Sequence, residues 1–176
     1  MSHVSENAEG SVESIHFAPA RREPRTQAPS VRVLPDWGIE GDAYGGPGER
    51  QVLLFWAESR SVVDTEGEPG LCYPKFRENL TIKGLDPGTL KPGDRLKVGT
   101  SMLRVTSVNK RCYPECGLPR KQCAIRAHLA FCAVISEGEI ARGDSVSLFR
   151  PTGQEYTSPG GSDEAQCTQS VKRHHP

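Results

Sequence analysis

The sequence has no long apolar segment and no net charge. Its 176 residues include no apolar run of the roughly 18 residues that a membrane-spanning helix needs. The 22 basic residues are balanced by 22 acidic residues, so no overall field draws the chain to nucleic acid or to an anionic membrane. The first ten residues, MSHVSENAEG, also lack the apolar stretch that directs secretion. We therefore expect a cytoplasmic protein that binds neither nucleic acid nor membrane.

Nucleotide-binding loops are missing as well. The glycine-rich segment GIEGDAYGGPGER, residues 38–50, lacks the Lys-Ser/Thr pair of a P-loop, and no G-x-G-x-x-G opens a helix there. Its glycines instead permit positive φ angles, which let the backbone approach a ligand or another strand closely.

Short strand patterns separated by Gly and Pro turns dominate the rest of the chain. A Gly-Asp turn that leads into alternating apolar residues occurs twice, in LKPGDRLKVG and in EIARGDSVSLF. Residues 57–66, AESRSVVDTE, have the composition of a short helix. The pattern, about seven or eight strands in all, predicts a mostly β fold. We expect a closed or nearly closed β-barrel with one or two short helices over residues 12–150, and disordered tails at 1–11 and 151–176.

Cysteine is frequent for a cytoplasmic chain. Without a secretory context, such thiols are more readily free, metal-bound or catalytic than paired in disulfides. The six cysteines are Cys72, Cys112, Cys116, Cys123, Cys132 and Cys167.

Cys112 is the strongest candidate for a functional residue. Leu103 and Val105 alternate with polar neighbours in LRVTSVNKRC, as in a half-buried strand, and Cys112 follows where this strand ends. The cations Lys110 and Arg111 precede it, and a thiol beside cations has its reactive thiolate form favoured. The alternative is that Cys112 is a small buried apolar residue.

Four blocks of sequence carry a family resemblance. GIEGDAYGGPGERQVLLF, RENLTIKGLDPGTLKPGDRLKVG, LRVTSVNKRC and GEIARGDSV, in this order and spacing, resemble the MOSC domain, which is named for the C-terminal part of molybdenum cofactor sulfurase. The resemblance covers roughly residues 12–150 and implies a barrel like the one inserted in pyruvate kinase. It also implies that Cys112 is the functional cysteine and that five further residues line a cofactor pocket: Asp42, Arg50, Gln51, Glu78 and Asn79.

The resemblance implies two related functions for Cys112. The thiolate could be the metal ligand that holds molybdenum cofactor, as in related amidoxime-reducing enzymes, with Lys110 and Arg111 on the pterin phosphate. It could instead carry sulfur for the cofactor as a persulfide, received from a cysteine desulfurase, with Cys116 as the resolving thiol. In the first case the protein would be a component of a molybdenum-dependent oxidoreductase, and in the second case a sulfur transferase. Arg120 and Lys121 are further candidates for phosphate contacts.

Two other interpretations remain open at this point. A structural zinc site could use Cys112, Cys116, Cys123 and either Cys132 or His128, although only the first pair has the usual ligand spacing. The barrel could also be a non-catalytic module that presents its glycine-rich loop to a partner protein.

Overall fold

The computed structural model describes residues 9–65, 71–72, 76–108 and 110–150, so both predicted tails lie largely outside the described residues. The strands are β1 (Glu9–Phe17), β2 (Thr26–Ala28), β3 (Ser30–Leu34), β4 (Gly38–Ile39), β5 (Val52–Trp56), β6 (Leu80–Lys83), β7 (Arg95–Val98), β8 (Ser101–Ser107), β9 (Leu129–Ser136), β10 (Gly138–Ala141) and β11 (Ser145–Phe149). The α-helices are α1 (Arg60–Thr65) and α2 (Ala124–Ala127), and the 3-10 turns are η1 (Ala57–Ser59), η3 (Pro87–Thr89) and η4 (Arg120–Gln122). None of the helices in the described ranges has the length and apolar character to span a membrane.

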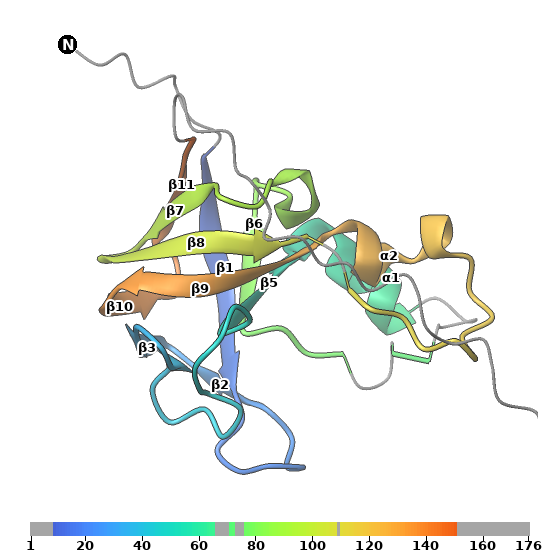
Figure 1. Ribbon diagram of the computed structural model, residues 1–176, viewed down its shortest axis with the longest axis horizontal. Coiled ribbons are helices and arrows are strands. Elements are labelled where there is room, and N and C mark those ends of the chain that lie inside the picture. The colour runs from blue at the N-terminus through green and yellow to red at the C-terminus, as the bar shows by residue number, and fades with distance from the viewer. Residues whose placement is uncertain (1–8, 66–70, 73–75, 109, 151–176) are drawn as a thin grey trace, which may run out of the picture.

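Seven strands close into a barrel, which confirms the predicted fold class (Figure 1). The order β11-β7-β8-β9-β5-β6-β1 is completed by pairing of β1 with β11. Every neighbouring pair in this barrel is antiparallel except β5 and β6, which run parallel. Parallel neighbours need a crossover connection, and η1 and α1 lie in the segment that makes it.

The first strand begins earlier than the sequence predicts. Residues 9–11 are polar, which predicts that they belong to the disordered tail, yet they pair with Ser145–Ser147 of β11. Backbone hydrogen bonds, which do not depend on side-chain polarity, hold them there. Gly10 suits this position, because a Cβ atom would lie 2.7 Å from the carbonyl oxygen of Lys83.

A β-bulge interrupts the regular alternation of inward and outward side chains in β1. The register with β6 shifts between Val12 and Ser14, so that Val12 and Ile15 are both buried in the barrel. Ser14 is thereby placed on the outside, where its hydroxyl donates to Thr81 Oγ1 at 2.7 Å. The bulge therefore determines which polar side chains line the outer face of β1.

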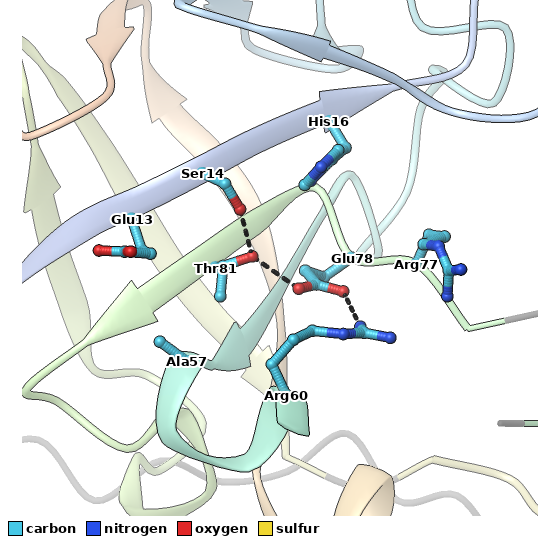
Figure 2. A pocket seen from close by; sticks show the side chains of 8 residues that line it. All are labelled: Glu13, Ser14, His16, Ala57, Arg60, Arg77, Glu78 and Thr81. Atoms are coloured by element: carbon cyan, nitrogen blue, oxygen red, sulfur yellow. Dashed lines mark hydrogen bonds and ion pairs between the residues drawn. The ribbon is translucent and has the colours of Figure 1, made fainter. Parts of the chain in front are cut away.

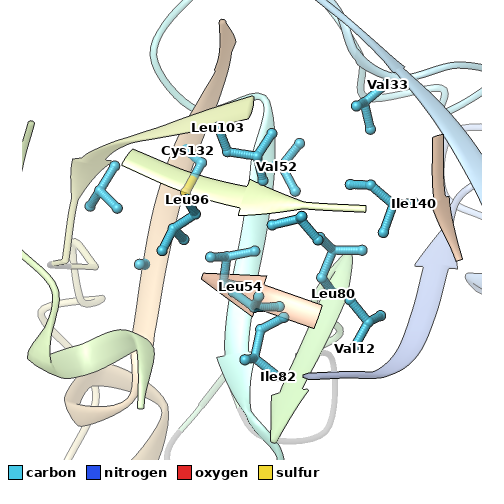
Figure 3. Close-up of a cluster of buried hydrophobic side chains, with 14 of the residues drawn as sticks. Val12, Val33, Val52, Leu54, Leu80, Ile82, Leu96, Leu103, Cys132 and Ile140 are labelled. Atoms are coloured by element: carbon cyan, nitrogen blue, oxygen red, sulfur yellow. The ribbon is translucent and has the colours of Figure 1, made fainter. Parts of the chain in front are cut away.

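The inside of the barrel is a continuous apolar core (Figure 3). Leu54, Leu80, Leu96 and Leu103 are fully buried there, and Cys132 lies among them. In β8, Leu103 and Val105 are buried while the residues between them are half exposed, as the sequence pattern predicts. Full burial of one such side chain contributes about 1.5–3 kcal/mol.

The glycine-rich segment packs closely against the start of β5. Gly38 has φ of +100°, and a Cβ atom there would lie 2.5 Å from the carbonyl oxygen of Gln51. Gly38 belongs to β4, which forms a small second sheet in the order β10-β3-β4. At Gly38, the predicted close approach is thus an approach to the backbone next to β5, whereas Gly41, Gly46 and Gly48 have nothing within 4 Å of their Cβ positions.

A second apolar cluster lies outside the barrel, on the side where α1 and α2 appear in Figure 1. It comprises Phe55, Val63, Phe76, Ile125 and Leu129. Phe55 and Leu129 come from paired positions of β5 and β9, while Val63 and Ile125 come from the two helices. This cluster holds the helices, and the loop before α2, against the outer wall of the barrel.

Candidate functional site

Cys112 lies in the long connection between β8 and β9. The strand β8 ends at Ser107, so Cys112 is five residues beyond the sheet rather than directly at its edge. A turn follows, in which the Cys116 amide donates to the carbonyl oxygen of Tyr113 at 3.2 Å. Leu118 and Ile125 then anchor the connection in the second apolar cluster. The loop is irregular, but the second apolar cluster fixes it to the outer wall of the barrel.

Four cysteines line one small cavity in this connection. They are Cys72, Cys112, Cys116 and Cys123, and each is partly accessible to solvent. The cavity has a volume of about 20 Å³ and includes the buried side chain of Ile125. Three of these cysteines are close in sequence, whereas Cys72 comes from the segment between α1 and β6. The sequence around Cys72 indicates no role for it, although Cys72 and Cys112 each begin a Cys-Tyr-Pro tripeptide.

Two cations contact sulfur atoms in the cavity. Lys110 Nζ lies 2.9 Å from Cys72 Sγ, and Arg126 Nη1 lies 3.9 Å from Cys112 Sγ. The same Arg126 nitrogen donates to the carbonyl oxygen of Lys110 at 2.7 Å, which fixes the guanidinium beside Cys112. The Cys112 thiol is 3.7 Å from that carbonyl and can donate to it. Lys110, which is expected to contact a pterin phosphate, thus also contacts a thiol, and Arg126 is a further cation that the sequence does not indicate.

Cys116 has the features of a reactive thiol. Hydrogen bonds from the backbone at Leu71 and Leu118 lower its pKa, and the positive charge of Lys110 adds to the effect. Reactive cysteines are those with a lowered pKa and access to solvent. The contact with Leu71 also places Cys116 beside the segment that carries Cys72.

A larger cavity adjoins the cysteines. Its volume is about 480 Å³, and its lining shares Cys72, Lys110 and Tyr113 with the smaller cavity. Phe76 and Glu115 complete the wall together with Leu71. A substrate in this space would therefore contact both a thiol and a cation.

The proposed zinc ligands do not all come together, because neither candidate for the fourth ligand lines the cysteine cavity. Cys132 is buried in the barrel core, where desolvation raises the pKa of its thiol, so it cannot be the fourth ligand. His128 Nδ1 is 2.7 Å from Asp86 Oδ2 and does not line the cysteine cavity. Within the described ranges, no three His, Cys, Asp or Glu side chains are placed where they could hold a metal ion.

The predicted cofactor residues Asp42 and Asn79 form a buried network at one end of the barrel. Asn79 Nδ2 donates to Asp42 Oδ2 at 2.9 Å and to the His16 carbonyl oxygen at 3.2 Å. Asn79 Oδ1 accepts from the Leu53 amide at 3.0 Å, and Arg25 Nη1 lies 3.0 Å from the Asp42 carboxylate. These bonds join β1, β5, β6 and the glycine-rich segment. The two residues therefore hold the scaffold together and do not line the cavity of Cys112.

Gln51 and Arg50 also make contacts with β9. The side-chain oxygen of Gln51 accepts from the Val134 amide at 2.8 Å, and Gln51 is almost completely buried. The Arg50 guanidinium lies over the ring of Phe131, 4.6 Å from its centroid. Among the remaining predicted cations, Arg111, Arg120 and Lys121 are exposed, and Arg120 lines the cysteine cavity.

Glu78 lies in a different, polar cavity of about 390 Å³ (Figure 2). Its buried carboxylate is 2.6 Å from Arg60 Nη1 and accepts a hydrogen bond from Thr81 Oγ1, also at 2.6 Å. Through the Ser14–Thr81 bond described above, a line of hydroxyls connects β1 to this ion pair (Figure 2). His16 lines the same cavity, and burial lowers its pKa. The structure thus separates Glu78 from Cys112.

Comparisons with known proteins agree with this fold. YuaD protein from Bacillus subtilis has a similar structure, with a TM-score of 0.62 and 16% sequence identity over 82% of this chain and 97% of that chain. YiiM from Geobacillus stearothermophilus gives a TM-score of 0.56 and 20% identity over 79% of this chain and 74% of that one. A search of curated proteins finds no match. The model of the MOSC domain matches residues 13–147, which is most of the chain, and the protein therefore belongs to the MOSC domain family.

Proposed function

We propose that this MOSC-domain protein is a cytoplasmic sulfur transferase, which carries sulfur for molybdenum cofactor as a persulfide on Cys112. The observation that carries the proposal is the cysteine cavity itself. It combines an accessible Cys112 sulfur, the Arg126 guanidinium 3.9 Å away and three further thiols. A cation beside sulfur stabilises the thiolate, which is both the attacking and the leaving form in sulfur exchange.

The loading step is an exchange between two thiols. The Cys112 thiolate attacks the outer sulfur of a persulfide on a donor protein of the cysteine desulfurase class. The sulfur–sulfur bond of the donor breaks, and its electron pair stays on the donor cysteine as a thiolate. Cys112 now carries the persulfide, so no oxidant or reductant is consumed. Cys116, with its lowered pKa, is the neighbour suited to resolve this persulfide by forming a disulfide and releasing hydrosulfide.

A second proposal is that Cys112 is a ligand of molybdenum in bound cofactor, as part of an oxidoreductase. The adjoining cavity of about 480 Å³, which Lys110 lines although Cys112 does not, favours it, because a pterin with an anionic phosphate needs both space and a cation. When bound, the cofactor would supply a redox-active metal held by sulfur ligands. Sulfur transfer has the stronger support, since Asp42, Gln51 and Asn79 are engaged in structural hydrogen bonds instead of lining this cavity.

The test of the first proposal is mass spectrometry after incubation with a cysteine desulfurase and cysteine. We expect the wild-type chain to gain one sulfur atom that is lost on reduction. Cys112→Ser should gain none at this position, whereas Cys123→Ser, a change in the same cavity, should still gain it. A wild-type chain that gains no sulfur atom under these conditions would refute the proposal.

The second proposal needs a separate measurement. Elemental analysis and pterin fluorescence of protein purified from cells that make the cofactor would show molybdenum and pterin in about equal amounts. Wild-type protein with neither of them would exclude the ligand role. The same preparation of Cys112→Ser should have lost most of the metal.

A further inference from the structure

Lys110 connects two cysteines that are far apart in the sequence. Its ammonium group lies 2.9 Å from Cys72 Sγ, while its carbonyl oxygen lies 3.7 Å from Cys112 Sγ. Cys72 and Cys112 are 40 positions apart in the numbering, and both line the same small cavity. Lys110 therefore contacts one thiol with its side chain and the other with its backbone.

Each of the two sulfurs has a cation of its own. Lys110 contacts Cys72, and Arg126 contacts Cys112. An ammonium or guanidinium group stabilises a thiolate sulfur more than a neutral thiol. For Cys123, in the same cavity, the described residues show no such contact between its sulfur and a cation. Among Cys72, Cys112 and Cys123, only Cys72 and Cys112 have sulfur atoms that contact a cation in the described residues. Cys116, in the same cavity, is the thiol that would compete with Cys72 for the persulfide.

Cys72 also borders the larger cavity, which Cys112 does not line. Sulfur on Cys72 would therefore face a space with a volume of about 480 Å³, whereas sulfur on Cys112 faces only about 20 Å³. A relay from Cys112 to Cys72 would move sulfur from a confined site to one with room for an acceptor molecule.

We propose that Cys72 is a second sulfur-carrying residue, which takes the sulfur from the Cys112 persulfide and presents it to the larger cavity. This inference rests on the proposed function of Cys112. The Cys72 thiolate attacks the outer sulfur of the persulfide and forms a new sulfur–sulfur bond. The bond between that sulfur and Cys112 Sγ breaks, and the electron pair stays on Cys112 as a thiolate beside Arg126. One persulfide and one thiolate are present before and after the step, so it is redox-neutral.

The experiment is a time course of sulfur loading by a cysteine desulfurase and cysteine, stopped by alkylation and followed by peptide mapping. In the wild-type chain we expect sulfur on Cys112 first and on Cys72 later. In Cys112→Ser, Cys72 should receive little sulfur, and in Cys72→Ser the sulfur should remain on Cys112. Cys123→Ser is the matched control and should behave as wild type. Unchanged unfolding midpoints would show that the variants are folded.

Lys110→Met tests the role of the ammonium group. Loss of a hydrogen bond to a charged group typically slows a step by about tenfold or more. We therefore expect transfer from Cys112 to Cys72 to slow by about tenfold, while the loading of Cys112 changes much less. Equal rates in Lys110→Met and wild type would contradict this role.

The outcomes separate the two proposals. If Cys112 is loaded and Cys72 never carries sulfur, the relay is wrong and the proposed function stands. If Cys72 is loaded as quickly in Cys112→Ser as in wild type, the order of the relay is wrong. If neither cysteine is loaded, both proposals fail.

Discussion

The ion pair between Arg60 and Glu78 should contribute more to stability than an exposed pair of the same chemistry. The Glu78 side chain is 2% exposed and lies 2.6 Å from Arg60, whose side chain is 20% exposed. Arg60→Met would leave this carboxylate buried with the Thr81 hydroxyl but without that cation. Removal of one partner from a buried ion pair costs about 3–5 kcal/mol. Because Arg60 is partly exposed, we expect the lower end of this range.

The assay is urea unfolding followed by circular dichroism. With a slope of about 2 kcal/mol per molar urea, a loss of about 3 kcal/mol lowers the midpoint by about 1.5 M. The matched control is Arg32→Met, because Arg32 and Glu137 form a pair at 3.3 Å with side chains that are 51% and 61% exposed. An exposed pair contributes about 0–1 kcal/mol, so the control midpoint should fall by less than about 0.5 M.

A double variant tests the cause of the loss. Arg60→Met combined with Glu78→Leu removes the uncompensated charge, so it should be more stable than Arg60→Met alone. The reasoning is refuted if Arg60→Met and Arg32→Met lower the midpoint equally. It is also refuted if the double variant is less stable than the single one.

Four further predictions concern the core, a glycine, a histidine and a buried thiol. Leu54→Ala, in the barrel core, should lower the free energy of unfolding by about 2–5 kcal/mol in the same assay. Gly38→Ala should cost more than about 1 kcal/mol because of the positive φ and the approach to the backbone, whereas Gly117→Ala, with nothing within 4 Å of its Cβ position, should be near neutral. Burial lowers the pKa of His16 below the ordinary 6.5, so the unfolded chain binds this proton at higher pH than the folded chain. Stability should therefore decrease as the pH falls below about 6.5, and decrease less in His16→Asn, as measured by unfolding midpoints at several pH values. In the folded protein, Cys132 should resist iodoacetamide and react only when denaturant is added, which alkylation and peptide mapping would show.

Local sequence signals predicted the barrel well. The alternation in β8 reflects burial of one face of the strand, and the apolar run of β5 reflects burial of both faces. Both patterns are visible in the residues of the strand itself, without knowledge of its neighbours. The bulge at Glu13 was missed because its effect appears only in the register with β6. The early start of β1 was missed because its polar residues are held by the backbone of β11.

The candidate site was predictable only in part. Cys112 and Cys116 could be selected because the cations and turn residues around them are adjacent in sequence. Cys72 and Arg126 could not, since the second apolar cluster brings their segments to Cys112 through tertiary packing. The family resemblance implies that Asp42 and Asn79 line a cofactor pocket, and the sequence gives no sign that both also belong to a buried network that joins strands.

Pairing between the first and the last barrel strands has a consequence for synthesis. Glu9–Ser11 pair along one edge with Ser145–Ser147, near the other end of the described chain. After β9 has paired with β5 and β8, and until β11 is made, the nascent polypeptide has an open edge along residues 9–11 of β1 and another along β7. Such edges are templates for association with other chains. Binding of chaperones to the nascent chain should therefore be strongest just before β11 emerges from the ribosome, and it should stop once β11 has closed the barrel.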